Sequence, residues 1–416
     1  MTFTSVEHST VLEWIKETSH PLATVDPAAP LDDLRPLLGM LGQASVVGYG
    51  AGTRGAHELF ALQARIARLL VEEGGFRAIA LEQDWTWGVR LDECVRTGEG
   101  DLRALLKDAA PFTSTEEVLG LLAWMRDFNR DHPEDPVRLV GVSPHPARDA
   151  AYDAVVGQVR RTAPHRAREL EDLYAELRPG QDIHDQIGRF WSLPDRRVWV
   201  DRARTAHDLV RSLTDDARTI QTARTIVQFY ELHDHDSLPH DPHNMACFER
   251  SFAENIAWWH RQTGQKVLWW TSSSHSSNGP GRAMSFPPAP PRALPNAGSF
   301  LRERLGPGYV SIGLTFREGE LAAYSGSKIF HVPGAAPELF ESVLGAVGLG
   351  DYLLDLRAEH PSAVAEQLGR TARFRAIGPV YDPDDDAAHH MTGGSPAEWF
   401  DVIVHRRHVT PARLLD

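Results

Sequence analysis

Short apolar runs of strand length recur along the chain and alternate with amphipathic helical stretches. The runs are Ser45–Tyr49, Ala78–Leu81, Val137–Gly141, Lys266–Trp270 and Gly308–Leu314. Apolar residues at three- and four-residue spacing follow the first run, at Leu59, Leu62, Ile66 and Leu69, and indicate a helix with one buried face. Strand–helix alternation predicts an α/β fold with a mainly parallel central sheet flanked by helices.

The stretch from residue 147 to 260 has helical periodicity and no convincing strand, which predicts a helical insertion or cap. Residues 274–298, rich in Pro, Gly, Ser and Ala, are expected to form a loop. Short strands return at Phe374–Val380 and Phe400–Val404. We therefore expect residues 1–416 to form a single α/β unit that contains the insertion.

Composition excludes several classes of partner. The formal net charge of −14 argues against nucleic acid, because phosphate binding needs a concentrated basic face. No apolar run is long enough to span a bilayer, and the first residues lack the pattern of a signal peptide. With only two cysteines, Cys94 and Cys247, the plain expectation is a reduced, cytoplasmic protein. The oligomeric state is left open.

Polar residues follow each predicted strand, where ligands of open parallel sheets bind. The segments are Gly50–Glu58, Glu82–Trp85, Ser143–Pro146, Thr271–His275 and Thr315–Glu318. A carboxylate at the end of a buried strand, such as Glu82, must be solvated, paired or protonated, which favours a site role. His275 is similarly placed. These segments predict one pocket for a small-molecule substrate.

Other chemistries are less well supported. Gly50, Gly52 and Gly55 suggest a phosphate-binding loop, but no acidic ribose ligand follows at the usual distance. Ser272–Ser274 lie near a histidine without the G-x-S-x-G motif of a nucleophilic serine. The His/Asp cluster at 233–243 matches no zinc signature, so we expect a solvated loop, no metal and no cofactor. His145, between two prolines, has two readings, a rigid-turn residue or a binding residue.

The same segments resemble the erythromycin esterase family. That family typically shows G-E-A-T-H-G-T-H-E-F-F after the first strand, L-E-A-D-W after the second and W-A-H-N-A-H after a later one. The corresponding runs here are Gly50–Phe60, Leu81–Trp85 and Trp270–His275, and the resemblance continues through Ser299–Leu305, Gly308–Phe316 and Arg373–Gly378. It covers nearly the whole chain.

The chain departs from this pattern at positions that do the family's chemistry. The resemblance implies that a histidine of the first motif is the base that activates water, and Arg54 stands there. Ala51 replaces a glutamate, Gln63 an arginine and Ser272 a histidine, whereas Glu82 and His275 match. An arginine stays protonated and cannot accept a proton from water. General-base assistance contributes roughly 10²–10⁴-fold, so its loss is expected to cripple the family's hydrolysis.

We therefore expect an enzyme remodelled for proton transfer, such as elimination, isomerisation or cyclisation, on a bulky polyketide-like natural product in bacterial biosynthesis. Glu82 and His275 would be the acid/base pair and Arg54 the anion-stabilising group. The predicted substrate-binding residues are His57, Trp85, His145, Ser272, Ser274 and Arg317. The alternatives are a hydrolase of macrolide-like esters or lactones that uses His57 or His275 as base, and a non-catalytic protein that binds or sequesters a small molecule.

Overall fold

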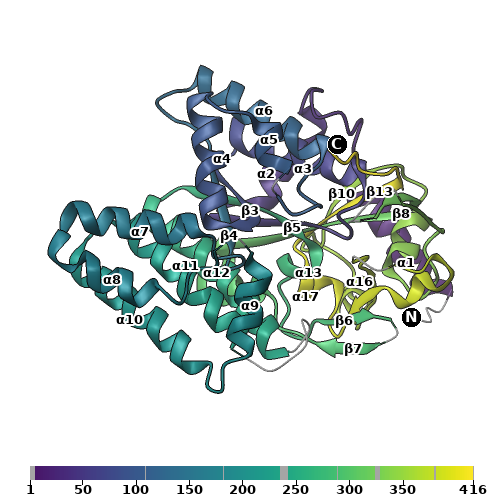
Figure 1. Ribbon diagram of the computed structural model, residues 1–416. Helices are drawn as coiled ribbons and strands as arrows, with labels where there is room; N and C mark the ends of the chain where they lie inside the picture. Colours follow the sequence, from purple (N-terminus) through teal and green to yellow (C-terminus); the bar gives the residue numbers. More distant parts are fainter. Residues whose placement is uncertain are drawn as a thin grey trace. The chain divides into compact units, whose positions relative to one another are not determined.

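A computed structural model describes residues 5–107, 109–180, 182–234, 242–287, 289–323, 328–378 and 381–415 (Figure 1). The chain divides into two compact units. The first comprises Met1–Ala80, Glu93–Arg138 and Gly264–Asp416, and the second comprises Leu81–Asp92 and Leu139–Thr263. Whether they behave as the single unit expected from the sequence stays a prediction, and each is described by itself.

The first unit is built on a mainly parallel sheet. Its strands, in spatial order, are β1 (His20–Pro21), β10 (Tyr352–Asp355), β13 (Val402–Val409), β8 (Tyr309–Ala322), β2 (Val46–Ala51), β5 (Lys266–Ser272) and β3 (Phe76–Asp84), with β9 (Ile329–Val332) on β8. The pairs β13–β8, β8–β2 and β2–β5 are parallel, whereas β1–β10, β10–β13 and β8–β9 are antiparallel. The predicted α/β fold class is confirmed.

Strand lengths differ from the predicted ones mainly at their carboxyl ends. β2 is fully buried and runs to Ala51, while β3 continues to Asp84, so Glu82 lies within a strand. β8 continues to Ala322 instead of ending at Leu314. Polar residues such as Thr315 remain in the strand because the ladder with β13 continues past them, from Val402 opposite Ile312 to Val409 opposite Gly319.

Helices of the first unit pack around this sheet. They are α1 (Ser5–Thr18), α2 (Pro36–Leu41), α3 (His57–Glu72), α5 (Leu102–Lys107), α6 (Glu116–Asp131), α13 (Ser273–Ser276), α14 (Ala297–Leu305), α15 (Phe340–Ala346), α16 (Ser362–Leu368) and α17 (Pro396–Trp399), with 3₁₀ turns at Asp32–Leu34, Gly306–Gly308 and Pro383–Ala388. α3 contacts β2 and α6, and its predicted apolar face is buried. α6 begins where the Thr115 hydroxyl accepts from the Val118 amide, a typical N-cap.

Residues 274–298 are not the loop expected from their composition. They hold α13 and the hairpin of β6 (Ala283–Phe286) and β7 (Ala289–Ala293), which joins β11 (Phe374–Arg375) and β12 (His390–Thr392) in a second sheet ordered β11-β12-β6-β7. The prolines are compatible with this arrangement because β7 is an edge strand, where a missing backbone donor costs no ladder bond.

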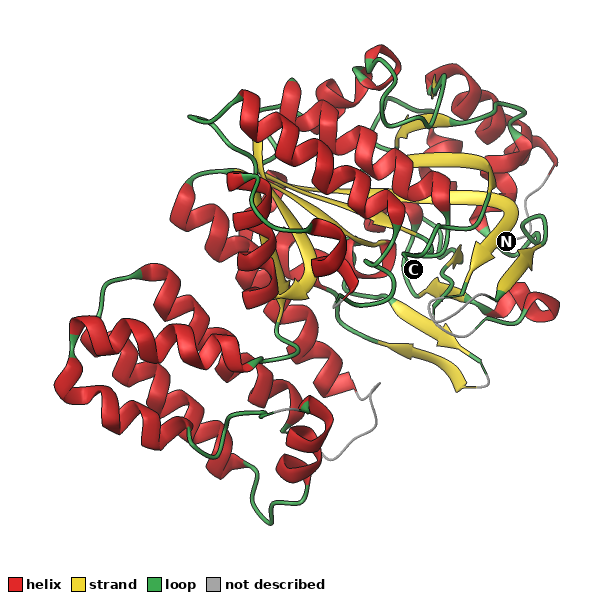
Figure 2. Ribbon diagram, turned by 45° about the horizontal axis from the view of Figure 1, so that its top comes forward, coloured by secondary structure: helices red, strands yellow, loops and turns green. Residues whose placement is uncertain are grey.

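The second unit is helical over the predicted insertion. It contains α7 (Asp149–Thr162), α8 (Ala167–Tyr174), α9 (Ile183–Trp191), α10 (Arg197–Leu213), α11 (Ala217–His233) and α12 (Pro242–Thr263), a 3₁₀ turn at Pro164–Arg166, and strand β4 (Arg138–Ser143), while α4 (Trp85–Thr97) crosses the boundary. Between Asp149 and Thr263 the described residues form no strand, as the colours of Figure 2 make clear.

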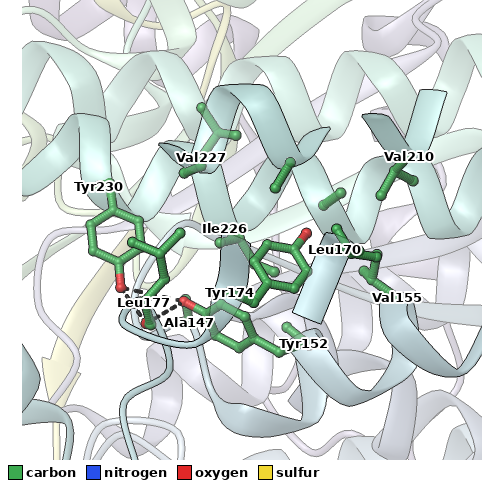
Figure 3. Packing of buried hydrophobic residues seen from close by; sticks show 14 of the residues in the cluster. Ala147, Tyr152, Val155, Leu170, Tyr174, Leu177, Val210, Ile226, Val227 and Tyr230 are labelled. Carbon is green, nitrogen blue, oxygen red and sulfur yellow. Dashed lines mark hydrogen bonds between the residues drawn. The ribbon is translucent and has the colours of Figure 1, made fainter. Parts of the chain in front are cut away.

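The helices of the second unit enclose an apolar core (Figure 3). Tyr152 packs edge-on against Tyr174, with ring centroids 5.0 Å apart. The hydroxyls of Tyr152 and Tyr230 both donate to the backbone oxygen of Leu177, so these buried polar groups are satisfied. Within the described residues no helix is both long and apolar enough to cross a membrane.

Candidate active site

Two strands of the first unit, β2 and β5, end side by side, while their neighbour β8 continues past this point. Ala51, the last residue of β2, is paired with Ser272 of β5 on one side and with Leu314 of β8 on the other. The buried side-chain amide of Gln63 donates to the backbone oxygens of Tyr49 (2.7 Å) and Thr271 (3.3 Å), and so ties α3 to β2 and β5. The loop after β2 and the helix after β5 therefore start from one fixed edge, as predicted.

Arg54 lies on the loop that joins β2 to α3. Its guanidinium carbon is 4.4 Å from the centroid of the Phe112 ring, in the geometry of a cation–π contact. The backbone oxygen of Gly55, the next residue, accepts from the amides of Ala322 (2.9 Å) and Ala412 (2.8 Å). Because these two hydrogen bonds hold the loop backbone, Arg54 next to Gly55 has a defined position.

Ser272, Ser274 and His275 lie at the end of β5 and in α13. The hydroxyls of Ser272 and Ser274 are 2.8 Å apart, and the His275 side chain belongs to a residue only 9% exposed. Gly50 permits this arrangement: a Cβ there would lie 2.3 Å from the Ser276 hydroxyl and 2.4 Å from the Ser273 backbone nitrogen. The strand can thus approach α13 only where a side chain is missing.

His57 begins α3 and is held by a hydrogen bond to a carboxylate. Its Nδ1 is 2.6 Å from the carboxylate of Glu117, which is 3% exposed in its side chain. Burial raises the pKa of Glu117, but hydrogen bonds from His57 and from backbone amides outweigh burial and leave the pKa lowered. Glu117 is therefore an acceptor, and Nδ1 of His57 is the donor. The guanidinium of Arg413, 3.3 Å from the same Nδ1, cannot donate to an atom that already carries a hydrogen.

The chain segment after β13 completes this region. The Thr410 amide and hydroxyl both donate to Glu58, the hydroxyl at 2.9 Å, and the Arg413 amide donates to Glu117 at 3.2 Å. The Leu415 amide donates to the oxygen of Ser114 at 3.0 Å. Residues 410–415 thus connect the start of α3 to the start of α6.

Arg317 does not follow a strand, because β8 continues to Ala322. Its side chain lies against α15, where a Cβ on Gly345 would be 2.7 Å from the Arg317 Cδ. Its role in substrate binding stays a prediction.

Glu82, Trp85 and His145 belong to the second unit. Glu82 lies in β3 and is partly buried. Trp85 is 4% exposed, and its indole nitrogen donates to the Thr222 hydroxyl at 2.9 Å, which fixes the ring in the core of that unit. The roles assigned to Glu82 and Trp85 from the sequence stay predictions.

His145 forms a partly buried pair with His233. Their ring nitrogens are 3.3 Å apart, and the His145 ring stacks on Phe229. Burial lowers the pKa of His145 to about 4 and that of His233 to about 3, so both are neutral near pH 7. Of the predicted His/Asp cluster, residues 235–241 lie outside the described residues. Among the described residues no group of His, Cys, Asp or Glu is arranged to hold a metal ion.

Three residues that contact the predicted set were not found from the sequence. Phe112 contacts Arg54, and Glu117 and Arg413 contact His57. Glu117 is 60 positions from His57 in the chain and Arg413 is 356 positions away. No local pattern connects residues so far apart, and only the tertiary structure brings them together.

A mainly parallel sheet with polar side chains at adjoining strand ends places the protein in the α/β class, in which ligand sites usually lie at this edge of the sheet. The family model described as erythromycin esterase matches residues 71–409, and the chain belongs to the erythromycin esterase family. The resemblance inferred from the motifs is thereby confirmed. Since the family includes esterases, the match supports enzyme activity in general and no particular reaction.

Individual relatives agree with this assignment. Erythromycin esterase type II of Escherichia coli is 26% identical over 118 residues, a match that spans 28% of this chain and only 28% of that relative. A solved Bacillus cereus protein has a TM-score of 0.86 at 26% identity, with both chains fully covered. A succinoglycan biosynthesis protein has a TM-score of 0.84 at 27% identity, covering 99% of this chain and 100% of the other.

A variant of the erythromycin esterase EreC in its open conformation is a more distant neighbour. Its TM-score is 0.69 at 17% identity, with 96% of this chain and 99% of the other covered. At this identity the likeness shows the fold alone.

Proposed function

We propose that this protein is an enzyme that transfers protons on a bulky, partly apolar natural product of the polyketide type, in an elimination, isomerisation or cyclisation. The observation that carries the proposal is a permanent cation, Arg54, on the loop after β2, three positions beyond the residue paired with Ser272. Phe112 at 4.4 Å gives this cation an apolar neighbour on which a partly apolar substrate can also rest.

The chemistry assigned to Arg54 follows from its charge. A base removes a proton from the carbon beside a substrate carbonyl, and the electron pair of that bond moves to the carbonyl oxygen. The Arg54 guanidinium donates hydrogen bonds to the resulting enolate oxygen. Return of a proton to another carbon gives isomerisation, and departure of a β-hydroxyl as water gives elimination.

His275 is proposed as the group that moves the proton. It follows Ser272 by three positions in α13, at the edge where β2 also ends. An imidazole can both accept and donate a proton, which suits it to the role of acid or base. Glu82 is proposed as its partner on the strength of the sequence motif alone.

Hydrolysis of a macrolide-like ester or lactone is the second candidate, favoured by membership of the erythromycin esterase family. Here His275 would activate water in place of the family's missing base. The two candidates differ in one atom, because only hydrolysis adds a solvent oxygen to the product.

The discriminating experiment incubates the protein with a panel of macrolide lactones and β-hydroxy-ketone polyketides in ¹⁸O-labelled water and, in parallel, in deuterium oxide. The proposal expects no ¹⁸O in the product, together with solvent deuterium on carbon for an isomerisation or the loss of the mass of one water for an elimination. Incorporation of ¹⁸O favours the hydrolase, whereas a ligand that binds and returns unchanged favours the non-catalytic alternative.

Two Arg54 variants test the charge. Arg54→Lys keeps a cation and should retain part of the activity, while Arg54→Met should lose about 10²–10³-fold in kcat, the usual effect of removing one oxyanion donor. Arg35→Met is the matched control, because this arginine also lies in the first unit but is exposed and pairs with Glu73. Equal activity of Arg54→Met and Arg35→Met would remove Arg54 from the mechanism.

A further inference from the structure

A cleft of about 750 Å³ lies in the first unit between α3, α6 and residues 24–28. Ala61 and Ala64 line it from α3, and Leu121 and Trp124 line it from α6. Of the residues predicted for the strand-end site, His57 lines this cleft, whereas Arg54 and His275 do not, so the cleft differs from the proposed catalytic site. The volume lies in the range typical of small-molecule pockets, and these walls are apolar.

The polar end of this cleft is the pair of His57 and Glu117. Because Nδ1 of His57 donates to Glu117 at 2.6 Å, Nε2 is the unprotonated nitrogen in the neutral form of the ring. The polar contacts of the His57 side chain with the rest of the described chain all involve Nδ1, and the His57 backbone amide donates to the Thr410 oxygen. His57 lines the cleft with 24% of its side chain exposed, which leaves Nε2 as an oriented hydrogen-bond acceptor.

Three of the charged groups around the cleft are already bound to partners. Arg68 pairs with Glu72 at 3.2 Å, Glu116 with Arg103 at 2.7 Å, and the carboxylate of Asp26 accepts from the Ala28 amide at 2.9 Å. Glu117, the remaining acid, is held by His57 and Arg413. A charged ligand would have to compete with these contacts, whereas a neutral one would not.

We propose that this cleft binds a neutral polycyclic molecule that carries a hydroxyl group, with the hydroxyl donating to Nε2 of His57. The apolar rings of the ligand lie between α3 and α6 and stack on Trp124, and Glu117 keeps the imidazole in the accepting tautomer. This site is independent of the function proposed for the strand ends.

A matched series of fluorescent probes tests the ligand class by fluorescence anisotropy. 1-Hydroxypyrene should bind saturably, and 1-methoxypyrene, which cannot donate, should bind about three- to tenfold more weakly. 1-Pyrenecarboxylate and 1-pyrenemethylammonium should also bind more weakly than 1-hydroxypyrene. Absence of saturable binding of 1-hydroxypyrene, or tighter binding of either charged probe, would overturn the proposal.

Gly120 allows the cleft to be blocked without disturbing its polar end. It lines the cleft from α6, and a Cβ built there meets nothing within 4 Å. Gly120→Trp should abolish binding of 1-hydroxypyrene and Gly120→Ala should preserve it. Gly188→Trp, at an equally open helix position in the second unit, controls for an added exposed indole. Unchanged binding by Gly120→Trp contradicts the assigned location.

The role of His57 has its own measurement. In His57→Phe, the affinity for 1-hydroxypyrene should fall to that for 1-methoxypyrene, because the acceptor is gone while the apolar ring remains. Long-range ¹H–¹⁵N spectra of the neutral imidazole should show a protonated Nδ1, and Glu117→Gln should weaken that preference. A protonated Nε2 in the native protein, or a hydroxyl preference that survives His57→Phe, refutes the proposed contact.

Discussion

Replacing Glu341 with Gln should change how the stability of the first unit depends on pH. Glu341, in α15, is 1% exposed, and both its oxygens accept from the Arg375 backbone amide at 3.1 and 3.2 Å. Burial raises its pKa to about 7; Arg375 and these hydrogen bonds oppose the rise, and the nearby Asp386 adds to it. An unfolded glutamate titrates near 4.5.

The sign follows from proton linkage. Between pH 4.5 and 7 the folded state holds a proton that the unfolded state has released, so the free energy of unfolding falls as the pH rises, and it levels off above 7. At 1.36 kcal/mol per pKa unit, the shift from 4.5 to about 7 corresponds to a loss of about 3 kcal/mol. Gln does not titrate. The difference in the free energy of unfolding between variant and native protein should therefore shift by about 3 kcal/mol in favour of the variant from acid to alkaline pH.

Chemical denaturation at pH 5 and pH 8, followed by fluorescence, measures this difference for both proteins. Glu366→Gln is the control: this residue is exposed on α16 and pairs with Arg370, so its effect should be a few tenths of a kcal/mol at either pH. A Glu341→Gln difference that is the same at pH 5 and pH 8 would show that the buried carboxyl does not titrate in this range.

Three further changes test the packing around the candidate sites. Arg65→Met should destabilise the protein by about 3–5 kcal/mol in denaturation, because it removes a fully buried guanidinium 2.7 Å from Asp33 and leaves that partly buried carboxylate unpaired. A loss under about 1 kcal/mol would contradict this. Gly50→Ala should cost about 1–3 kcal/mol by overpacking against Ser276, and an unchanged melting temperature would show that α13 yields freely. His145, whose pKa is lowered to about 4, should make the free energy of unfolding fall as the pH drops from 6.5 to 4, since only the unfolded state binds the proton there. A His145→Asn variant whose stability falls as steeply as that of the native protein would refute this.

The sheet edge was predictable from the sequence because its strands are short, apolar and fully buried. Val46–Ala51 and Lys266–Ser272 stand out by composition, and the rule that ligands bind at carboxyl ends then points to Arg54 and His275. The β6–β7 hairpin was missed because its prolines are typical of loops, and only its edge position makes them acceptable.

The pair of His57 and Glu117 shows a different limit. Each residue lies in the first turn of a helix, where polar side chains are common and carry no signal of a site. Their contact depends on α3 packing against α6, which is a property of the tertiary structure. Sequence reasoning therefore identified His57 as a candidate without its partner or the cleft beside it.

The segment at 410–415 has a consequence for how the protein matures in the cell. Glu58 and Thr410, which bind each other, are 352 positions apart in the chain. At ribosomal rates of about 5–20 residues per second, roughly 20 to 70 seconds separate the synthesis of the two. Until Ala412 has been synthesised, the Gly55 oxygen lacks one of its two donors, so a ribosome stalled before residue 410 should leave the Arg54 loop more open to proteolysis than it is in the finished molecule.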